Sequence, residues 1–457
     1  MMNLKQATRI APGECIAFSG AGGKTTALFI LARELNTPVL VTTTTHFGLD
    51  QLTLADKNMR VDASTDIGEI FEILQDGVLL LRGAETAENK VAGIPDDKLE
   101  EIYFASRERE ITLLIEADGS RQLPLKAPAS HEPQIPPFVD RVIVVAGLSG
   151  LGQPLSEKWV HRPKQFADIS GLNLGESISP FVVVDVLKSP YGGQKGIPPE
   201  AKRIVLLNQA DIHQLQSQGT RIAKQLTGDY DSIIVASLKT RSVPDNRLSE
   251  DQRVEGYKIF AAHEPVGAII LAAGKAVRMG RIKQLLPWKG KPLLWHVAQA
   301  ALSEGLEEVI IVIGAEGKQI RESLNDLNVR FVENPDWELG QSTSLQVGLR
   351  ALSPQIGASI FLLADQPQVS PTLIRSLIEK HATTLAPIIA PIVDGKRGNP
   401  VLFDRRVFNE FMSIQGDTGG RELFSRYPVE WLEWHDARVL LDIDTEQDYQ
   451  RLLNGEY

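Results

Sequence analysis

The stretch LAAGKAVRMGRIKQLLP, residues 271–287, decides the fold of the second half of the chain, because its parts follow the order of a nucleotide-phosphate loop. It continues a short apolar run, residues 266–271, whose branched side chains predict a buried parallel strand. Gly274 and Gly280 have no side chain, so backbone N–H groups there can come close to phosphate oxygens. The stretch therefore predicts a strand that ends in an anion-binding loop.

Two basic residues and a helix follow the glycines. Arg278 and Lys283 supply positive charge, and Pro292 opens a helical pattern at a position where its missing N–H group costs nothing. LAAGKAVRMG followed by KQLLPW is similar to the signature of the MobA-like nucleotidyltransferases, and within them to the molybdenum cofactor cytidylyltransferases. The plain alternative is a glycine-rich turn with two solvated basic residues.

Length and composition bound the class of protein. A chain of 457 residues is too long for one ordinary core, and two domains fit the motifs best. With 43% hydrophobic and 23% charged residues, the composition is that of a soluble globular protein. We find neither a membrane-spanning apolar run nor a signal peptide and expect a cytoplasmic protein. The net charge of −10 argues against nucleic-acid binding, and the single cysteine, Cys15, excludes an intrachain disulfide.

Strands alternate with helical patterns along the whole chain, which predicts an α/β protein of two domains. We expect a P-loop-like α/β domain at residues 1–262, a charged linker at about 239–265 and a doubly wound, mostly parallel Rossmann-like domain at 263–457. The expected strands cover residues 14–19, 39–41, 111–115, 141–146, 181–186, 204–207 and 232–235, then 266–271, 309–313, 329–332, 359–364, 387–392 and 439–443.

Aspartates at strand ends predict a magnesium site in the second domain. Asp365 follows an apolar strand and shares its sheet edge with the glycine loop, and ADQP is similar to the metal-binding motif of the family. An aspartate there can also simply form a turn. Asp442 and Asp444 lie in LLDIDT, where strand alternation would point both to one face. Asp442 is the expected second ligand, because Asp444 or Thr445 can instead cap the terminal helix.

The resemblance covers nearly all of the second domain, through NPDWELGQSTSL, GKRGNPVLF and GDTGGR. It implies CTP as substrate, since Ala273 stands where a glycine would favour GTP. It also implies catalysis by Arg278, Lys283 and Asp365, with transfer to the terminal phosphate of the molybdopterin cofactor. The residues expected to bind nucleotide or acceptor are Leu271, Ala272, Ala273, Gly274, Gly280, Ser342, Ser344 and Asn399.

A second glycine loop, GAGGKTT, lies near the N-terminus and matches the short G-x-x-G-K-T form. It predicts ATP or GTP binding, with Lys24 on the outer phosphates, Thr25 on magnesium, and Glu116 or, in our assignment, Asp118 holding that metal. The alternative is a glycine-rich helix entry. His46, His131 and His161 are potential ligands or bases, but we interpret each of them as structural. The residues expected to bind this nucleotide are Gly20, Gly22, Gly23, Lys24, Thr25 and Thr26.

The N-terminal half as a whole resembles the YqeC-like accessory proteins linked to selenium-dependent molybdenum hydroxylases, through VTTTTH, EADGSRQLPLKAP and VHRP. We therefore predict a fusion of an accessory nucleotide-binding domain with a cytidylyltransferase. Its expected partners are the molybdopterin cofactor and a molybdenum hydroxylase apoenzyme. Two alternatives remain: nucleotide transfer to a sugar or alditol phosphate, and a protein that carries the cofactor without catalysis.

Overall fold

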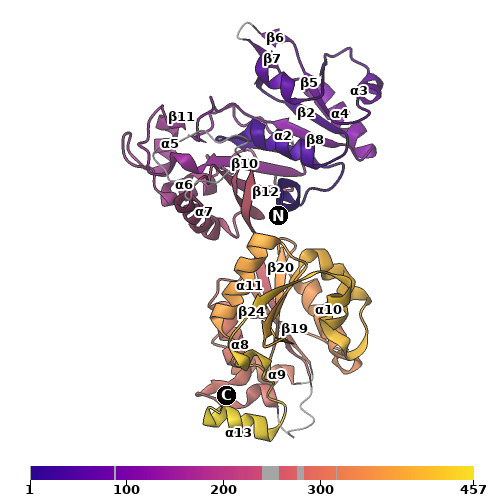
Figure 1. Cartoon of the computed structure of the whole chain (residues 1–457), viewed down its shortest axis with the longest axis vertical. Coiled ribbons are helices and arrows are strands. Elements are labelled where there is room, and N and C mark those ends of the chain that lie inside the picture. Colours follow the sequence, from indigo (N-terminus) through magenta and orange to yellow (C-terminus); the bar gives the residue numbers. More distant parts are fainter. Residues whose placement is uncertain (1, 87–88, 239–256, 275–281, 315, 457) are drawn as a thin grey trace. The chain divides into compact units, whose positions relative to one another are not determined.

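The computed structural model describes residues 2–86, 89–238, 257–274, 282–314 and 316–456 (Figure 1). The chain divides into two compact units, Met1–His263 and Glu264–Tyr457. Each unit has its own sheet, and we describe each by itself.

A nine-stranded sheet forms the N-terminal unit, counted over its described residues. All its strands are parallel to their neighbours except β14, which pairs antiparallel with β13. In spatial order they are β14 (Lys258–His263), β13 (Ser232–Ser237), β12 (Lys202–Asn208), β10 (Arg141–Gly147), β1 (Cys15–Gly20), β8 (Thr112–Glu116), β2 (Val39–Thr43), β5 (Val78–Arg82) and β4 (Lys57–Arg60).

The central strands of this sheet are apolar throughout because helices cover both faces. On β1, for example, Cys15 and Ala17 belong to a core cluster on one face, while Ile16 and Phe18 are buried but point the other way. The helices are α1 (Leu4–Thr8), α2 (Lys24–Glu34), α3 (Ile67–Ile73), α4 (Asp96–Glu108), α5 (Pro163–Ser170), α6 (Pro180–Lys188) and α7 (His213–Leu226). Short strands outside the main sheet are β3 (His46–Gly48), β6 (Glu85–Thr86), β7 (Lys90–Ala92), β9 (Leu125–Lys126) and β11 (Val160–His161).

The C-terminal unit is also a doubly wound sheet. Its strands are β19 (Arg330–Glu333), β18 (Glu308–Ile313), β15 (Val266–Ala272), β20 (Ala358–Leu363), β23 (Val401–Asp404), β21 (Ile388–Val393) and β22 (Lys396–Arg397), with β24 (Val429–Glu433) beside β21. Strands β19, β18, β15 and β20 run parallel, and β23 is antiparallel to both of its neighbours. A two-stranded ribbon joins β16 (Pro287–Trp288) and β17 (Lys291–Pro292).

Alternation along β15 builds two cores, one on each face of this sheet. Ala268 and Ile270 belong to the cluster with α8 and α11, whereas Ile269 belongs to the cluster with α10. Figure 1 shows α8 and α11 on one side of the strands and α10 on the other. The helices are α8 (Leu293–Leu302), α9 (Gly317–Ser323), α10 (Gln341–Ala351), α11 (Pro371–Thr384), α12 (Leu423–Arg426) and α13 (Glu446–Asn454).

The fold class predicted from the sequence is confirmed, but three assignments were wrong. Residues 181–186 are helical, because Ser179 accepts a hydrogen bond from Val182 N and Pro180 starts α6. Residues 439–443 are no strand, since a 3₁₀ turn, η8 (Ala437–Leu440), capped by Asp436, occupies the start. Residues 258–263 of the expected linker form β14 instead. Their backbone pairs with β13, although the charged residues before them in the sequence had suggested a linker.

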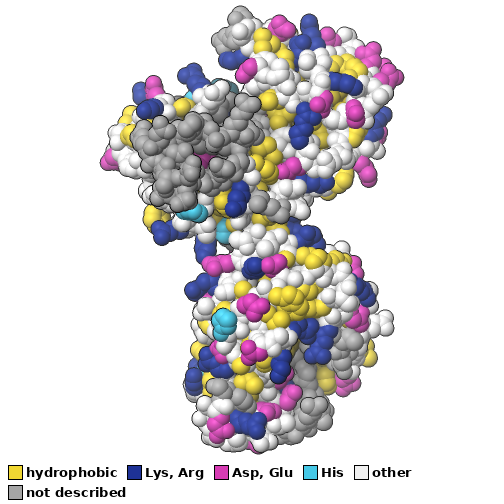
Figure 2. Space-filling model, viewed as in Figure 1, with side chains coloured by type: hydrophobic (Ala, Val, Ile, Leu, Met, Phe, Trp, Pro, Cys, Tyr) yellow, Lys and Arg dark blue, Asp and Glu magenta, His cyan; other side chains and the backbone are white. Residues whose placement is uncertain are grey.

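Basic and acidic side chains of the described residues are interspersed on the face seen in Figure 2. Among the described helices, none combines the length and apolar character needed to cross a bilayer.

Candidate functional sites

Lys283 and Asp365 meet at the edge of the C-terminal sheet where the parallel strands β15 and β20 end. Lys283 opens a 3₁₀ turn, η4 (Lys283–Leu285), and Asp365 follows β20 by two residues. The Lys283 Nζ atom lies 2.6 Å from Asp365 Oδ2 and 2.9 Å from Asp444 Oδ1. Burial lowers the pKa of Lys283, but Asp365 and Asp444 outweigh it, and the net shift is upward. The ammonium group is therefore held in its charged form.

Asp442 completes a group of three carboxylates around this lysine. Gln366 Nε2 donates to Asp442 Oδ1 at 2.6 Å. Burial raises the pKa of Asp442, and the charges of Asp365 and Asp444 raise it further. The three aspartates thus lie close enough to repel one another, which is the arrangement that a divalent cation relieves.

The helix-capping role considered for Asp444 belongs to its neighbours instead. Thr445 is the N-cap of α13, and its side chain and that of Asp448 form a reciprocal capping box. Asp444 pairs with Lys283 and so joins Asp365 and Asp442 in the cluster. The strand predicted to carry Asp442 and Asp444 is not formed, so their shared direction does not come from strand alternation.

One oxygen of Asp365 suits a bound cation. Asp365 Oδ1 is buried and, among the described residues, has no hydrogen-bond partner, whereas Oδ2 takes Lys283. A buried oxygen without a partner calls for a ligand. Magnesium prefers carboxylate oxygens, so the three aspartates fit that ion.

The first glycine loop quoted above is described only in part. Arg278 and Gly280 lie outside the described residues, and Gly274 is the last residue before that gap. Leu271 and Ala272 end β15, and Ala273 packs in the core beside α10. These three residues can therefore offer a ligand mainly their backbone groups.

Gln284 is a site residue that the sequence reasoning missed. Its side chain is buried, and Nε2 donates to the carbonyl oxygens of Gly274 at 3.0 Å and of Ala272 at 3.4 Å. It thereby ties η4 to the start of the loop. Its place directly after Lys283 in the quoted KQLLPW segment was the available signal.

Ser342 and Ser344 lie in the first turn of α10, and both are buried. Ser344 Oγ accepts a hydrogen bond from Asn334 Nδ2 at 2.9 Å, so this hydroxyl supports the turn before the helix. Asn399 is half-buried between β22 and β23, and its neighbour Gly398 packs closely under Val439 of η8.

In the N-terminal unit, the glycine loop connects the carboxyl end of the central strand β1 to the start of α2. Gly20 and Gly22 both have φ of 92°, which favours glycine. A Cβ atom at Gly20 would lie 2.2 Å from Val145 O, and one at Gly22 would lie 2.5 Å from Gly147 N. Gly23 caps α2 with φ of 119°. The loop is thus pressed against β10, with the N-terminus of α2 opening at Lys24.

Lys24 is buried and contacts two oxygens. Its Nζ donates to Gly20 O at 2.8 Å and lies 3.2 Å from Asp118 Oδ1. Asp118 Oδ2 also accepts from Gly20 N at 3.0 Å and pairs with Lys126 Nζ at 2.9 Å. Each oxygen of Asp118 thus faces a lysine, although its buried Oδ1, like that of Asp365, accepts no hydrogen bond from the described residues.

Glu116 stands nearer to the hydroxyl that would touch magnesium. Thr25 Oγ1 donates to Glu116 Oε2 at 2.7 Å. Burial raises the pKa of Glu116, and the charge of Lys24 opposes that rise.

A cleft of about 1130 Å³ opens beside this loop. Lys24, Thr25 and Thr26 of α2 line it together with Glu116. The three histidines interpreted as structural, His46, His131 and His161, line the same cleft.

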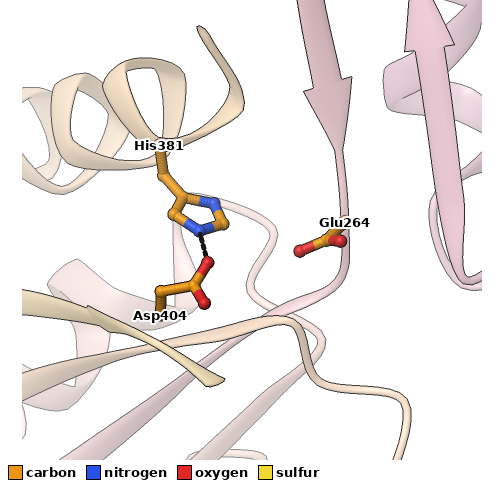
Figure 3. A group of neighbouring side chains, drawn as sticks. All are labelled: Glu264, His381 and Asp404. Carbon is orange, nitrogen blue, oxygen red and sulfur yellow. Dashed lines mark hydrogen bonds and ion pairs between the residues drawn. The ribbon is translucent and has the colours of Figure 1, made fainter. Parts of the chain in front are cut away.

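A third cluster joins Glu264, His381 and Asp404, all buried, at the opposite end of the C-terminal sheet (Figure 3). His381 Nε2 and Asp404 Oδ2 lie 2.8 Å apart, and Asp404 Oδ1 accepts from Arg406 N and Nε at 2.9 Å each. The guanidinium group of Arg406 already pairs with Asp404, so it would compete with a metal cation for this carboxylate. We assign this cluster to anchoring α11 on β23.

Two family models match the chain. That of the YqeC protein family matches residues 16–164, and that of the MobA-like NTP transferase domain matches residues 268–431. The uncharacterized protein YqeC of Escherichia coli is 35% identical over 201 residues, which cover 42% of this chain and 75% of that protein.

Two further relatives carry the names of different reactions. Nicotine blue oxidoreductase of Paenarthrobacter nicotinovorans is 31% identical over 198 residues, 41% of this chain and 96% of that protein. Molybdenum cofactor cytidylyltransferase of Escherichia coli is 27% identical over 186 residues, 40% of this chain and 93% of that protein. With both units matched by family models and both sheets in place, the chain is a fusion of a YqeC family member with a nucleotidyltransferase of the MobA-like family.

Proposed function

We propose that the C-terminal unit transfers CMP from CTP to the terminal phosphate of the molybdopterin cofactor and releases pyrophosphate. The observation that carries this proposal is the contact of Lys283 with Asp365 and Asp444, with Asp442 beside them. Transfer of a nucleotidyl group needs little covalent chemistry from the protein, so positioning and charge neutralisation account for catalysis.

The side chains divide the work. Lys283, held charged, stabilises negative charge that develops on the transferred phosphate. Gln284 holds the carbonyl groups of Ala272 and Gly274 and so orients the start of the glycine loop. Asp365, Asp442 and Asp444 would hold magnesium, which supplies a Lewis acid at the triphosphate. Arg278 and Gly280 keep the roles inferred from the sequence, and the attacking oxygen belongs to the acceptor phosphate.

The choice of CTP rests on Ala273, the residue that separates the two nucleotide classes in the family resemblance. The relative named a molybdenum cofactor cytidylyltransferase supports both CTP and the molybdopterin acceptor. Ser342, Ser344 and Asn399 are proposed to shape the nucleotide and acceptor sites, Ser344 through the turn that it stabilises with Asn334.

For the N-terminal unit we propose binding of ATP or GTP in the service of molybdenum hydroxylase maturation. Gly20, Gly22 and Gly23 shape the loop, and Lys24 at the N-terminus of α2 faces the outer phosphates. Glu116 rather than Asp118 is the proposed magnesium partner, because Glu116 contacts Thr25 whereas Asp118 is occupied by Lys24 and Lys126.

Identity alone does not select the reaction, since the relative named an oxidoreductase is slightly more similar than the one named a cytidylyltransferase. The carboxylates around Lys283 favour nucleotide transfer, because a metal–triphosphate complex needs negative groups to bind the metal and a positive group to face the phosphates. Transfer to a sugar or alditol phosphate, and carriage of the cofactor without catalysis, remain the rival functions.

Pyrophosphate release separates these functions. The full chain would be mixed with magnesium, one of CTP, GTP or ATP, and either purified molybdopterin cofactor or a panel of sugar and alditol phosphates. We expect release with CTP and cofactor alone. Release with a sugar phosphate would support the rival transferase, and tight cofactor binding without release would support the carrier.

A further inference from the structure

The N-terminal cleft has a second wall that the nucleotide loop does not use. This wall is made up of residues 119–123, of His131, Glu132 and Gln134, and of residues 157 and 160–163. Ligand pockets usually span about 300 to 1000 Å³, and this cleft measures about 1130 Å³. It therefore has room for a second ligand beside the nucleotide.

Unusual backbone conformations gather at the cleft. Arg121, Gln122, Arg162 and Gln209 line it, and these non-glycine residues have φ of 51°, 59°, 65° and 64°. Left-handed conformations at residues with side chains are unfavourable and persist only where the surroundings hold them, commonly at functional sites.

A chain of buried ion pairs runs from the glycine loop to this wall. Lys24 lies 3.2 Å from Asp118, and Asp118 lies 2.9 Å from Lys126. Lys126 in turn lies 2.9 Å from Glu132, which Arg162 grips with two hydrogen bonds of 2.7 and 2.8 Å. The chain fixes Arg162 and links it to Lys24 beside the glycine loop.

Three cations and one carboxylate act on His161, and Glu157 lines the same wall. His161 on β11 pairs in register with Lys126 on β9. Its pKa is lowered to about 4 by burial and then by Arg162, Lys126 and Arg121, with Glu132 as the opposing charge. The imidazole is neutral at pH 7. Arg121 is exposed and, within the described residues, forms no ion pair with a carboxylate.

We propose that this wall binds the phosphate group of a second substrate, a phosphomonoester, between Arg121 and the imidazole of His161, across the cleft from the nucleotide. The guanidinium fork and an imidazole N–H match the oxygens of a phosphate, and the Arg121 guanidinium supplies the positive charge that the anion needs. This goes beyond the function proposed above, which gives the N-terminal unit a nucleotide and no second substrate.

Isothermal titration calorimetry on the full chain tests the site, with glycerol 3-phosphate as the probe. It would be titrated with and without magnesium and a non-hydrolysable ATP analogue, with acetate and glycerol as companion probes. We expect one equivalent of glycerol 3-phosphate to bind in both conditions without displacing the analogue. Arg121→Gln should weaken binding at least about tenfold, because it removes the unpaired cation.

The matched control is Lys158→Gln, which removes an exposed cation of the same wall segment that stacks on Trp159 outside the cleft lining. It should leave the affinity unchanged. Equal affinity in Arg121→Gln, displacement of the ATP analogue, or equally tight binding of acetate would each overturn the proposal. Since the titration is also made without nucleotide, failure of the nucleotide assignment would show separately, as an analogue that does not bind.

Discussion

Lys283 Nζ lies 2.6 Å from Asp365 Oδ2, although 82 residues separate them in the chain. The contact exists because β15 and β20 are parallel neighbours, so the segments that follow them emerge at one edge. Asp444, from the segment before α13, reaches the same lysine.

Asp365→Asn should lower the rate of pyrophosphate release from CTP at least about a hundredfold, because it removes charge from the proposed magnesium site with little change in volume. Asp326→Asn is the matched control, since Asp326 also pairs with a lysine, Lys291, at 2.6 Å but on the surface. Release would be followed in a coupled assay, and thermal unfolding would confirm that both variants fold. A rate near that of the unaltered protein would remove Asp365 from the site.

Lys283→Ala should lower kcat/KM for CTP. The expected loss of transition-state stabilisation is roughly 2.7–4 kcal/mol, the size seen when one charge-stabilising donor is removed. Lys291→Ala, which breaks the surface pair with Asp326, should cost little. Steady-state kinetics at several magnesium concentrations would compare the two. If both variants behaved alike, Lys283 would serve only to balance the aspartates.

Glu132→Gln should destabilise the N-terminal unit at pH 7 by roughly 3–5 kcal/mol, because it leaves Lys126 and Arg162 facing a neutral group. Burial would raise the pKa of Glu132, but hydrogen bonds from Arg162 and Lys126 outweigh it and lower the pKa from 4.5 to about 2.

A carboxyl with a lowered pKa contributes stability that is present above its ordinary pKa and is lost as the pH falls through the folded one. The difference in the free energy of unfolding between the variant and the unaltered protein should therefore be largest above pH 4.5 and should shrink as the pH falls toward 2. Urea unfolding across that range measures it, and a gap independent of pH would contradict the assignment.

A fragment spanning residues 264–457 should fold and transfer cytidylate without the N-terminal unit. The cut falls between the two compact units, after β14, which pairs with β13 of the N-terminal sheet. Lys24→Ala in the full chain should likewise spare transfer in vitro while impairing hydroxylase maturation in cells. Circular dichroism and pyrophosphate release would test the fragment. A folded but inactive fragment would show that transfer needs the N-terminal unit.

Local pattern predicted much of the sheet framework. Apolar runs such as residues 266–271 and 359–364 became β15 and β20 within a residue or two, because a strand covered on both faces must be apolar throughout. The same pattern misled at residues 181–186, where a serine cap and a proline select a helix from equally apolar residues.

The sequence by itself determined the α/β class, the N-terminal glycine loop and the identity of the charged residues that follow the strands, since these depend on neighbours along the chain. Only the tertiary structure decided which charges meet. It paired Lys283 with Asp444 rather than leaving Asp444 to cap α13, paired Asp118 with two lysines, and brought Arg121 and His161 to the lining of one cleft. Such contacts join residues far apart in sequence, so they follow from strand order and packing, which no local pattern encodes.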